Sequence, residues 1–183
     1  MLLLVTGFLV LGILNGSNIH PSFNQNTMGF LSIDPVRDGY TPEQSRQFFD
    51  RLPERLRDSG KIPFFALAAQ PPFFSSDDEN GFPMETDSSH VQQSLAEQTV
   101  GAGYFATLNE PLMAGREFEE KDTRNLNGTS LTPLILNQKA ARTFFPDGNA
   151  VGRRLHDRNK AYEVVGMVGD TKDAAGMTQP LAF

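Results

Sequence analysis

Three small residues in the middle of the chain have a spacing that could hold a dinucleotide cofactor. Gly101, Gly103 and Ala106 follow the pattern G-x-G-x-x-A within the stretch VGAGYFATLNEP. In dinucleotide-binding folds this loop joins a buried parallel strand to a helix of several turns, and its glycines let the backbone approach the pyrophosphate. The interpretation therefore depends on the elements on either side of the pattern.

The segments before and after the G-x-G-x-x-A pattern do not match those of a dinucleotide-binding fold. The preceding residues 94–100, SLAEQTV, are too polar for a strand that is covered on both faces. The helix expected over 103–108 is short, because Pro111 follows closely. We interpret the glycines as a tight strand-to-helix turn that directs Tyr104 and Phe105 into the core. The sequence thus predicts no cofactor-binding residue and no cofactor.

The sequence also offers no candidate residues for a disulfide, a metal site or a catalytic site. The chain has no cysteine, which excludes disulfides, thiolate catalysis and Cys-ligated metals. Its three histidines are far apart in the sequence and none has a neighbour at metal-ligand spacing. It contains neither a G-x-S-x-G nor a G-x-x-x-x-G-K-[ST] motif. The acidic run at 117–122 is typical of a solvated face. We therefore predict no catalytic and no metal-binding residue.

Composition and charge narrow the class of protein. The 183 residues are 39% hydrophobic and 21% charged, which is typical of a folded domain or two small subdomains. The net charge of -6 argues against a nucleic-acid partner, because phosphates attract a basic surface. Phenylalanine is abundant, and its frequent occurrence in pairs indicates packing material.

The N-terminal residues suggest a membrane attachment. Residues 1–14 are almost entirely apolar, but they are fewer than the ~20 that span a bilayer. They lack the basic start and the small-residue cleavage site of a secretory signal. We favour the end of a transmembrane helix over 1–16, truncated here, followed by a polar linker. A buried core helix is the alternative that remains open.

The remaining pattern predicts a mixed α/β fold (α+β). Residues 28–35 are expected to form a strand, 40–60 a helix with an N-cap at Thr41, and 61–74 a second strand, so that 28–74 is a β-α-β unit. In it, 28–34 should pair with 62–70 beneath Phe48, Leu52 and Leu56. Residues 75–93 are read as a loop. The remaining elements form a second mixed α/β lobe over 94–170, with strands at 94–100, 131–137 and 161–170, helices at 103–108 and 138–145, and a turn at Gly115.

Several stretches resemble one family when they are taken in order. They are DGYTPEQSRQFFDRLPERLR, GYFATLNEPLMAGREFEEKD, LILNQKAARTFFPDGNAVGRRL and YEVVGMVGDTKD. Their order and spacing resemble the periplasmic core domain of MacB/FtsX-type ABC transporter permeases, especially the large duplicated permeases of acidobacteria. The signature residues that carry the resemblance are Gly103, Tyr104, Phe105, Gly115, Arg116, Asp122, Phe144, Phe145, Pro146, Gly152, Arg153 and Arg154. Pro53 and the stretch GKIPFF depart from the family pattern.

The resemblance implies a location, a role and partners. It implies a MacB-like periplasmic core domain over 17–183, with a porter-like part and an inserted second lobe, on the periplasmic side of the bacterial inner membrane. The implied role is scaffolding and mechanotransmission in export or efflux, and it is not enzymatic. The implied partners are the remaining transmembrane region of the permease and a cytoplasmic ATP-binding subunit or domain, with a permease dimer and a periplasmic adaptor as further options.

Two other classes of function stay open at this point. A soluble α/β ligand-binding module of the periplasm would need the apolar N-terminus to pack as core and the Phe pairs to line a pocket. A hydrolase would need one of the acidic clusters to be buried. The signature residues offer one structural hypothesis of their own: Gly115 turns the chain, and Arg116 then holds either the Asp122 carboxylate or carbonyls at the end of the 103–108 helix.

Overall fold

The computed structural model describes residues 28–71, 82–86, 89–124, 131–157, 160–171 and 178–183. The chain divides into two units, which are described separately. One comprises Gln25–Phe65 and is called the N-terminal unit. The other begins at Ala66, extends to Phe183, and is called the sheet unit. The apolar run 1–14 lies outside the described residues. Within them, no helix has the length and apolar character needed to cross a membrane.

The N-terminal unit is built around one amphipathic helix, α2 (Pro42–Asp58). Its start is the one predicted: Thr41 Oγ1 accepts from the Gln44 backbone N–H at 3.3 Å, and Gln44 Oε1 accepts from the Thr41 N–H at 2.8 Å. This capping box satisfies two of the N–H groups that a helix start leaves free. The helix runs through Pro53 and is capped by Ser59.

The two strands predicted beside α2 are wrong. Residues 28–34 and 61–67 form no strand, and Ala68 makes only an isolated bridge to Val100. The predicted pairing of 28–34 with 62–70 is therefore absent, and residues 72–74 lie outside the described ranges. The apolar stripe of α2, with Phe48, Leu52 and Leu56, is half-buried rather than buried. A local apolar pattern can favour an extended backbone, but a strand also needs a neighbour, and this unit supplies none.

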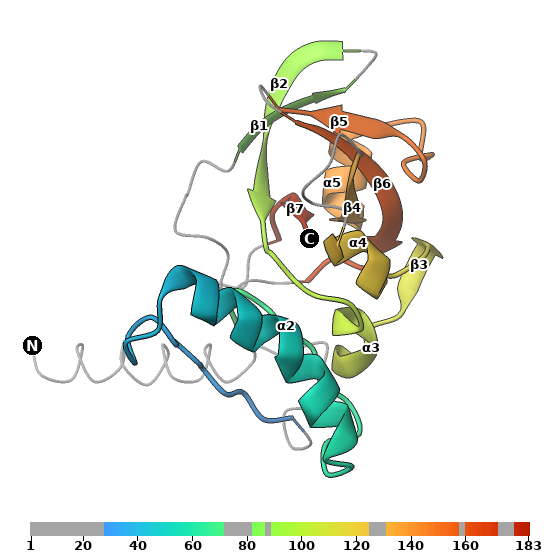
Figure 1. Ribbon diagram of the computed structural model, residues 1–183. Coiled ribbons are helices and arrows are strands. Elements are labelled where there is room, and N and C mark those ends of the chain that lie inside the picture. Colours follow the sequence, from blue (N-terminus) through green and yellow to red (C-terminus); the bar gives the residue numbers. More distant parts are fainter. Residues whose placement is uncertain (1–27, 72–81, 87–88, 125–130, 158–159, 172–177) are drawn as a thin grey trace, which may run out of the picture. The chain divides into compact units, whose positions relative to one another are not determined.

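The sheet unit contains a mixed seven-stranded sheet (Figure 1). Its strands are β1 (Phe82–Thr86), β2 (Ser89–Glu97), β3 (Leu112–Gly115), β4 (Thr132–Asn137), β5 (Arg154–His156), β6 (Ala161–Val168) and β7 (Leu181–Ala182). The order is β3-β6-β4-β7-β2-β1-β5, and β5 also pairs with β6. The long strand β6 thus has β5 beside its beginning and β3 beside its end, both antiparallel.

The core of the sheet unit follows from two strand patterns. β6 alternates, so that Tyr162, Val164, Gly166 and Val168 are buried while the residues between them are partly exposed. β4 is buried at every position from Leu134 to Asn137, as expected for a strand that pairs in parallel with β6 and lies under a helix. That helix is α5 (Gln138–Phe144), which packs against β4, β6 and β7. The predicted strand at 131–137, helix at 138–145 and strand at 161–170 are confirmed.

Several short elements were not predicted. Residues 82–86 and 89–93 were read as loop, but they belong to the antiparallel hairpin of β1 and β2. Only one face of such a hairpin is buried, as Met84 and Thr86 illustrate, so polar residues on the other face are tolerated. The strands β3, β5 and β7 and the helix α4 (Glu120–Arg124) are only two to five residues long. Such lengths carry almost no periodic signal.

Candidate functional site

Two backbone segments that carry signature residues form hydrogen bonds to the same short piece of β6. Gly115 and Arg116 reach it from β3, while Gly152 and Arg153 reach it from the segment before β5. The Arg116 N–H donates to the Val165 carbonyl at 2.9 Å, and the Gly152 N–H donates to the Val164 carbonyl at 2.7 Å. The Val164 N–H in turn donates to the Arg153 carbonyl at 2.9 Å. Residues almost forty positions apart in the sequence thus complete the edge of one strand.

The first turn depends on two glycines that face each other. Gly115 has a φ of +77° and pairs with Gly166 of β6. A Cβ on Gly115 would lie 2.2 Å from the Val165 carbonyl oxygen, and a Cβ on Gly166 would lie 2.5 Å from the Arg116 carbonyl oxygen. Both distances are far below van der Waals contact. The two backbones therefore approach more closely than any side chain would allow. The prediction that Gly115 adopts a backbone conformation unfavourable for a side chain is confirmed, and Gly115 is the last residue of β3.

Arg116 and Asp122 form a forked ion pair. Arg116 Nη1 donates to Asp122 Oδ2 at 2.7 Å, and Arg116 Nη2 donates to Oδ1 at 3.1 Å. The same Nη1 also donates to the Glu117 carbonyl at 2.9 Å. The Asp122 side chain is 11% exposed and that of Arg116 is 40% exposed. Of the two partners considered for Arg116, the Asp122 carboxylate is therefore the one observed.

The carboxylate of Asp122 also closes the loop that leads to α4. The Glu119 N–H donates to Asp122 Oδ2 at 2.8 Å, and the Asp122 N–H donates to the Glu119 carbonyl at 2.9 Å. Burial alone would raise the pKa of Asp122, but the bonds from Arg116 and from the Glu119 N–H outweigh it and hold the pKa below its usual value. The bond to Asp122 correspondingly raises the pKa of Arg116. Asp122 thus remains ionised and pins residues 116–122.

The neighbour of Arg116 makes the contact to the short helix α3 (Tyr104–Leu108). Glu117 Oε1 accepts from the Phe105 backbone N–H at 2.8 Å. This bond satisfies a free N–H in the first turn of α3, whose N-cap Gly103 has no side chain to do so. Sequence reasoning missed Glu117, because it treated the acidic run 117–122 as a solvated face.

Tyr104 and Phe105, which follow Gly103 in the first signature group, lie in the core as predicted. Phe105 is fully buried and Tyr104 is 5% exposed. The ring of Phe183 lies 5.0 Å from that of Phe105 and 6.2 Å from that of Tyr104, so three aromatic rings pack together. Burial raises the pKa of Tyr104 to about 12, and its hydroxyl accepts from Gln98 Nε2 at 3.3 Å.

The remaining signature residues support the C-terminal end of α5. Phe144 and Phe145 are buried, while Pro146 is exposed. The guanidinium of Arg153 lies 5.0 Å from the centre of the Phe145 ring, and its Nη1 donates to Asp147 Oδ2 at 3.1 Å. Arg153 thereby covers a core aromatic ring and closes the turn between α5 and β5. Arg154, the first residue of β5, is exposed.

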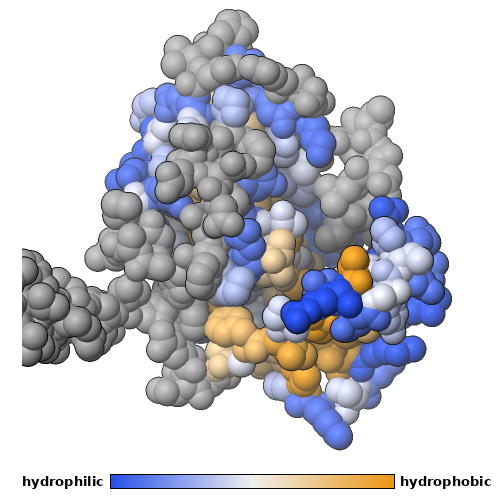
Figure 2. Space-filling view, turned by 90° about the vertical axis from the view of Figure 1, so that its left-hand side faces the viewer, coloured by the Kyte–Doolittle hydropathy of each residue, from blue (hydrophilic) through white to orange (hydrophobic). Residues whose placement is uncertain are grey.

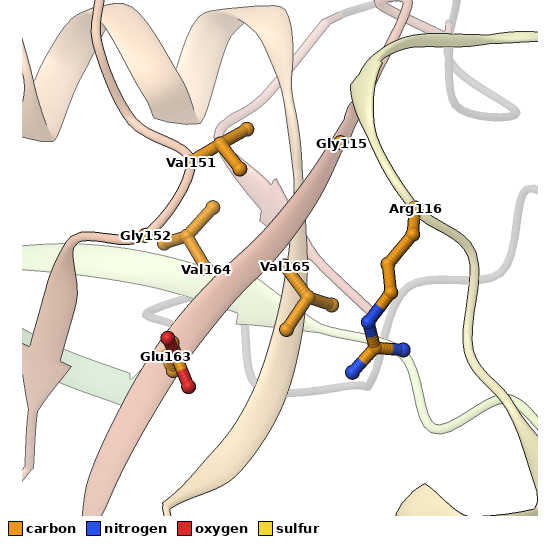
Figure 3. A pocket seen from close by; sticks show the side chains of 7 residues that line it. All are labelled: Gly115, Arg116, Val151, Gly152, Glu163, Val164 and Val165. Carbon is orange, nitrogen blue, oxygen red and sulfur yellow. The ribbon is translucent and has the colours of Figure 1, made fainter.

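An open hollow of about 360 Å³ lies where the two turns meet β6 (Figure 3). Its lining comes from three places, namely the Gly115-Arg116 turn, the Val151-Gly152 turn and residues 163–165 of β6. Arg116 and Glu163 are its charged residues, and the Arg116 guanidinium is already engaged by Asp122. Within the described parts of the chain, no three histidine or carboxylate side chains come together as metal ligands would.

Asn137 is a buried polar residue that the sequence analysis did not identify. It is 1% exposed and lies at the junction of β4 and α5. Its Oδ1 accepts from the Ala140 N–H at 2.8 Å and from the Leu181 N–H at 3.0 Å, and its Nδ2 donates to the Gln179 carbonyl at 2.8 Å. An Asn between a strand and a helix predicts an N-cap. Its bonds to residues 179 and 181, over forty positions away, have no local signal.

Among the solved structures similar to this chain are three domains of transporter or permease proteins. The periplasmic region of MacB from Actinobacillus actinomycetemcomitans is 19% identical with a TM-score of 0.45. The extracellular domain of the noncanonic ABC-type transporter YknZ from Gram-positive bacteria is 14% identical with a TM-score of 0.46. A domain assigned to a permease protein of Porphyromonas gingivalis is 15% identical with a TM-score of 0.39.

The similarity covers part of each molecule. The matches include 62%, 70% and 56% of this chain, and 48%, 58% and 45% of the respective solved chains. This chain therefore spans about half the length of the structures it matches. No protein-family model matches the sequence, and no curated protein matches it.

Proposed function

We propose that this chain is the extracytoplasmic domain of an ABC transporter permease and acts there as a non-catalytic scaffold that transmits motion. The order of the sequence signatures first suggests this role. In this proposal residues 1–16 are the end of a transmembrane helix, 28–74 the porter-like part and 94–170 the second lobe. The domain faces the periplasm from the inner membrane, and ATP is hydrolysed by a separate cytoplasmic subunit or domain.

The observation that supports the proposal is that the charged signature residues bind partners within the domain itself. Arg116, Asp122 and Arg153 all direct their charges to partners within the sheet unit, where they fasten the turns after β3 and before β5. A group engaged in this way is suited to holding a loop in place. A scaffold that passes force through β6 needs such fastened turns, since both of them bond to the edge of that strand at Val164 and Val165.

The location can be tested with topology reporters on the full chain. Alkaline phosphatase is active only outside the cytoplasm, and green fluorescent protein folds well only inside it. Each is fused after Phe183 and expressed in a Gram-negative host. We expect phosphatase activity, no green fluorescence, and recovery of the fusion with the inner-membrane fraction. Recovery in the soluble periplasmic fraction would instead favour the ligand-binding module, and green fluorescence would contradict both.

The absence of nucleotide chemistry is tested separately by calorimetry. The purified chain should bind neither NAD nor ATP at micromolar concentration, because α3 has five residues and the glycines before it shape a turn. Micromolar binding that is lost in a correctly folded Gly103→Val variant would overturn the proposal. Circular dichroism provides the check on folding.

A further inference from the structure

The N-terminal unit has almost no buried interior. Among residues 28–65, only Pro35 and Ser45 are buried, and the apolar stripe of α2 is half-buried. A unit of this size that buries so little apolar surface gains little free energy to offset the cost of ordering its chain. Its exposed apolar segments are therefore suited to contact a surface outside the unit.

Apolar side chains are exposed in this unit to an unusual extent. Seven of the eight exposed large hydrophobic residues in the described ranges lie between Phe30 and Phe64. The most exposed are Leu31 at 83% and Phe64 at 75%, and the others are Phe30, Ile33, Val36, Tyr40 and Ile62. Figure 2 shows hydrophobic surface gathered in one area, next to strongly hydrophilic side chains. Such gathering marks an interaction surface.

The position of these residues in the sequence indicates what covers them. The exposed segment begins at residues 28–33, directly after the residues outside the described ranges. The apolar run 1–14 ends only thirteen residues earlier. Thirteen residues span at most about 45 Å when fully extended. If residues 1–14 lie in a bilayer, the exposed segment stays within reach of that bilayer's surface.

The composition of the unit also suits a lipid surface. Residues 25–65 carry six basic and six acidic side chains, so the unit is neutral and the whole net charge of -6 belongs to the rest of the chain. Basic residues, Arg37 and Lys61, directly adjoin the exposed Val36 and Ile62. Long cationic side chains beside apolar ones can extend to headgroups while the apolar groups enter the acyl boundary.

We propose that residues 28–40 and 61–65 of the N-terminal unit dock on the lipid bilayer, with Leu31 and Phe64 entering the interface between headgroups and acyl chains. The inference rests on the proposed membrane location, because it takes residues 1–14 as the anchor. It adds a contact that is separate from the anchor: the folded unit itself lies against the membrane and is covered by it.

The chain has no tryptophan, so a single introduced tryptophan reports one position. Leu31→Trp and Phe64→Trp place the probe on the proposed surface. Glu54→Trp is the matched control on the exposed polar side of α2. Met113→Trp is the control at an exposed large hydrophobic residue of the sheet unit. Each full-length variant is reconstituted with phosphatidylcholine vesicles, with and without bromine on the acyl chains.

We expect bromine to quench most of the fluorescence of Trp at 31 and 64, with a blue shift on vesicle binding, and to leave Trp at 54 and 113 almost unchanged. Flotation of the vesicles separates the two proposals. Flotation without quenching at 31 and 64 overturns the docking alone, whereas failure to float contradicts the membrane anchor and the docking with it. Equal quenching at all four positions also overturns it. A blue shift that grows with protein concentration, without lipid and without quenching, would assign the surface to a second copy of the chain.

Discussion

Gly115 and Gly166 face each other across β3 and β6 at a distance that leaves no room for a side chain on either residue. A Cβ on Gly115 would meet the Val165 carbonyl oxygen at 2.2 Å, and one on Gly166 would meet the Arg116 carbonyl oxygen at 2.5 Å. This close approach of the two backbones determines the direction of the chain after the end of β3. It also places Arg116 so that its N–H completes β6 while its guanidinium reaches Asp122.

The first prediction separates this close approach from backbone conformation. Gly115 and Gly148 both have left-handed backbones, with φ of +77° and +80°, but an added Cβ at Gly148 meets nothing within 4 Å. Gly148→Ala should therefore cost only the conformational penalty of about 1–2 kcal/mol. Gly115→Ala carries the same penalty plus a backbone clash, and it should destabilise clearly more. Urea unfolding measures the loss of stability caused by each substitution. Equal losses would contradict the importance of the close approach of Gly115 to Gly166.

The second prediction concerns the coupling of Arg116 and Asp122. In a double-mutant cycle of Arg116→Ala, Asp122→Ala and the double variant, we expect a coupling free energy of about 1–2 kcal/mol, reduced from a fully buried value because Arg116 is partly exposed. Arg116→Lys should restore only part of it, since an ammonium group cannot reproduce the fork. The pair Arg153 and Asp147, which is more exposed, is the control and should couple by about 0–1 kcal/mol. Simple additivity at 116 and 122 would exclude the proposed pinning.

The third prediction is the pH dependence of the same contact. The pKa of Asp122 is lower in the folded chain than its usual value of 3.8, so the ionised form is the one that the fold stabilises. This contribution is fully present above the pKa of the unfolded chain, about 4, and is lost as the pH falls through the lower folded pKa. The stability difference between the natural chain and Asp122→Asn should thus be large at pH 6 and shrink below pH 4. A difference that stays constant down to pH 2 would mean that the charge of Asp122 does not contribute.

The fourth prediction concerns the missed residue Asn137. Asn137→Ala leaves the buried N–H of Ala140 and the partly buried N–H of Leu181 without an acceptor, and the Gln179 carbonyl without its donor. We expect a loss of about 3 kcal/mol, against about 1 kcal/mol for Thr41→Ala at the exposed cap of α2. Asn137→Asp keeps the acceptor but turns a buried carboxylate oxygen toward the Gln179 carbonyl, so at neutral pH it should cost at least as much as Asn137→Ala. If Asn137→Ala costs no more than Thr41→Ala, the bonds to residues 179 and 181 are not significant for stability.

The sequence predicted those parts of the fold that are specified locally. Thr41, Pro42 and Gln44 mark the start of α2 within a few residues, and the apolar runs of β4 and β6 are long enough to show their burial patterns. Gly103 and Gly115 were identified as turn residues because a glycine just before a helix or after an apolar run has few other uses. The Asp122 carboxylate was one of two partners predicted for Arg116, because a guanidinium can bind a carboxylate with two parallel hydrogen bonds and because both residues belong to the family signature.

What the sequence could not predict depends on contacts between distant residues. Glu117, and not Arg116, binds the first turn of α3. Which of the two side chains reaches α3 depends on the direction of the backbone after the close approach of Gly115 to Gly166. The strand β7 exists because residues 181 and 182 fit between β2 and β4, and two residues carry no pattern of their own. Residues 28–34 show the converse case, in which an apolar segment that resembles a strand has no neighbouring strand.

The last prediction tests how differently the two units are stabilised. Leu136 of β4 is fully buried, and Leu136→Ala should cost about 2–5 kcal/mol through lost burial and the cavity left behind. Leu52 of α2 is half-buried, so Leu52→Ala in the free chain should cost well under that range, at about 1 kcal/mol, because less area returns to water. Hydrogen exchange monitored by mass spectrometry follows each unit separately. Residues 42–58 should exchange faster than β4 and β6, and Leu52→Ala should accelerate exchange in α2 only. Equal protection of α2 and β4 in the absence of any partner would show that the N-terminal unit has an interior that the observed burial does not provide.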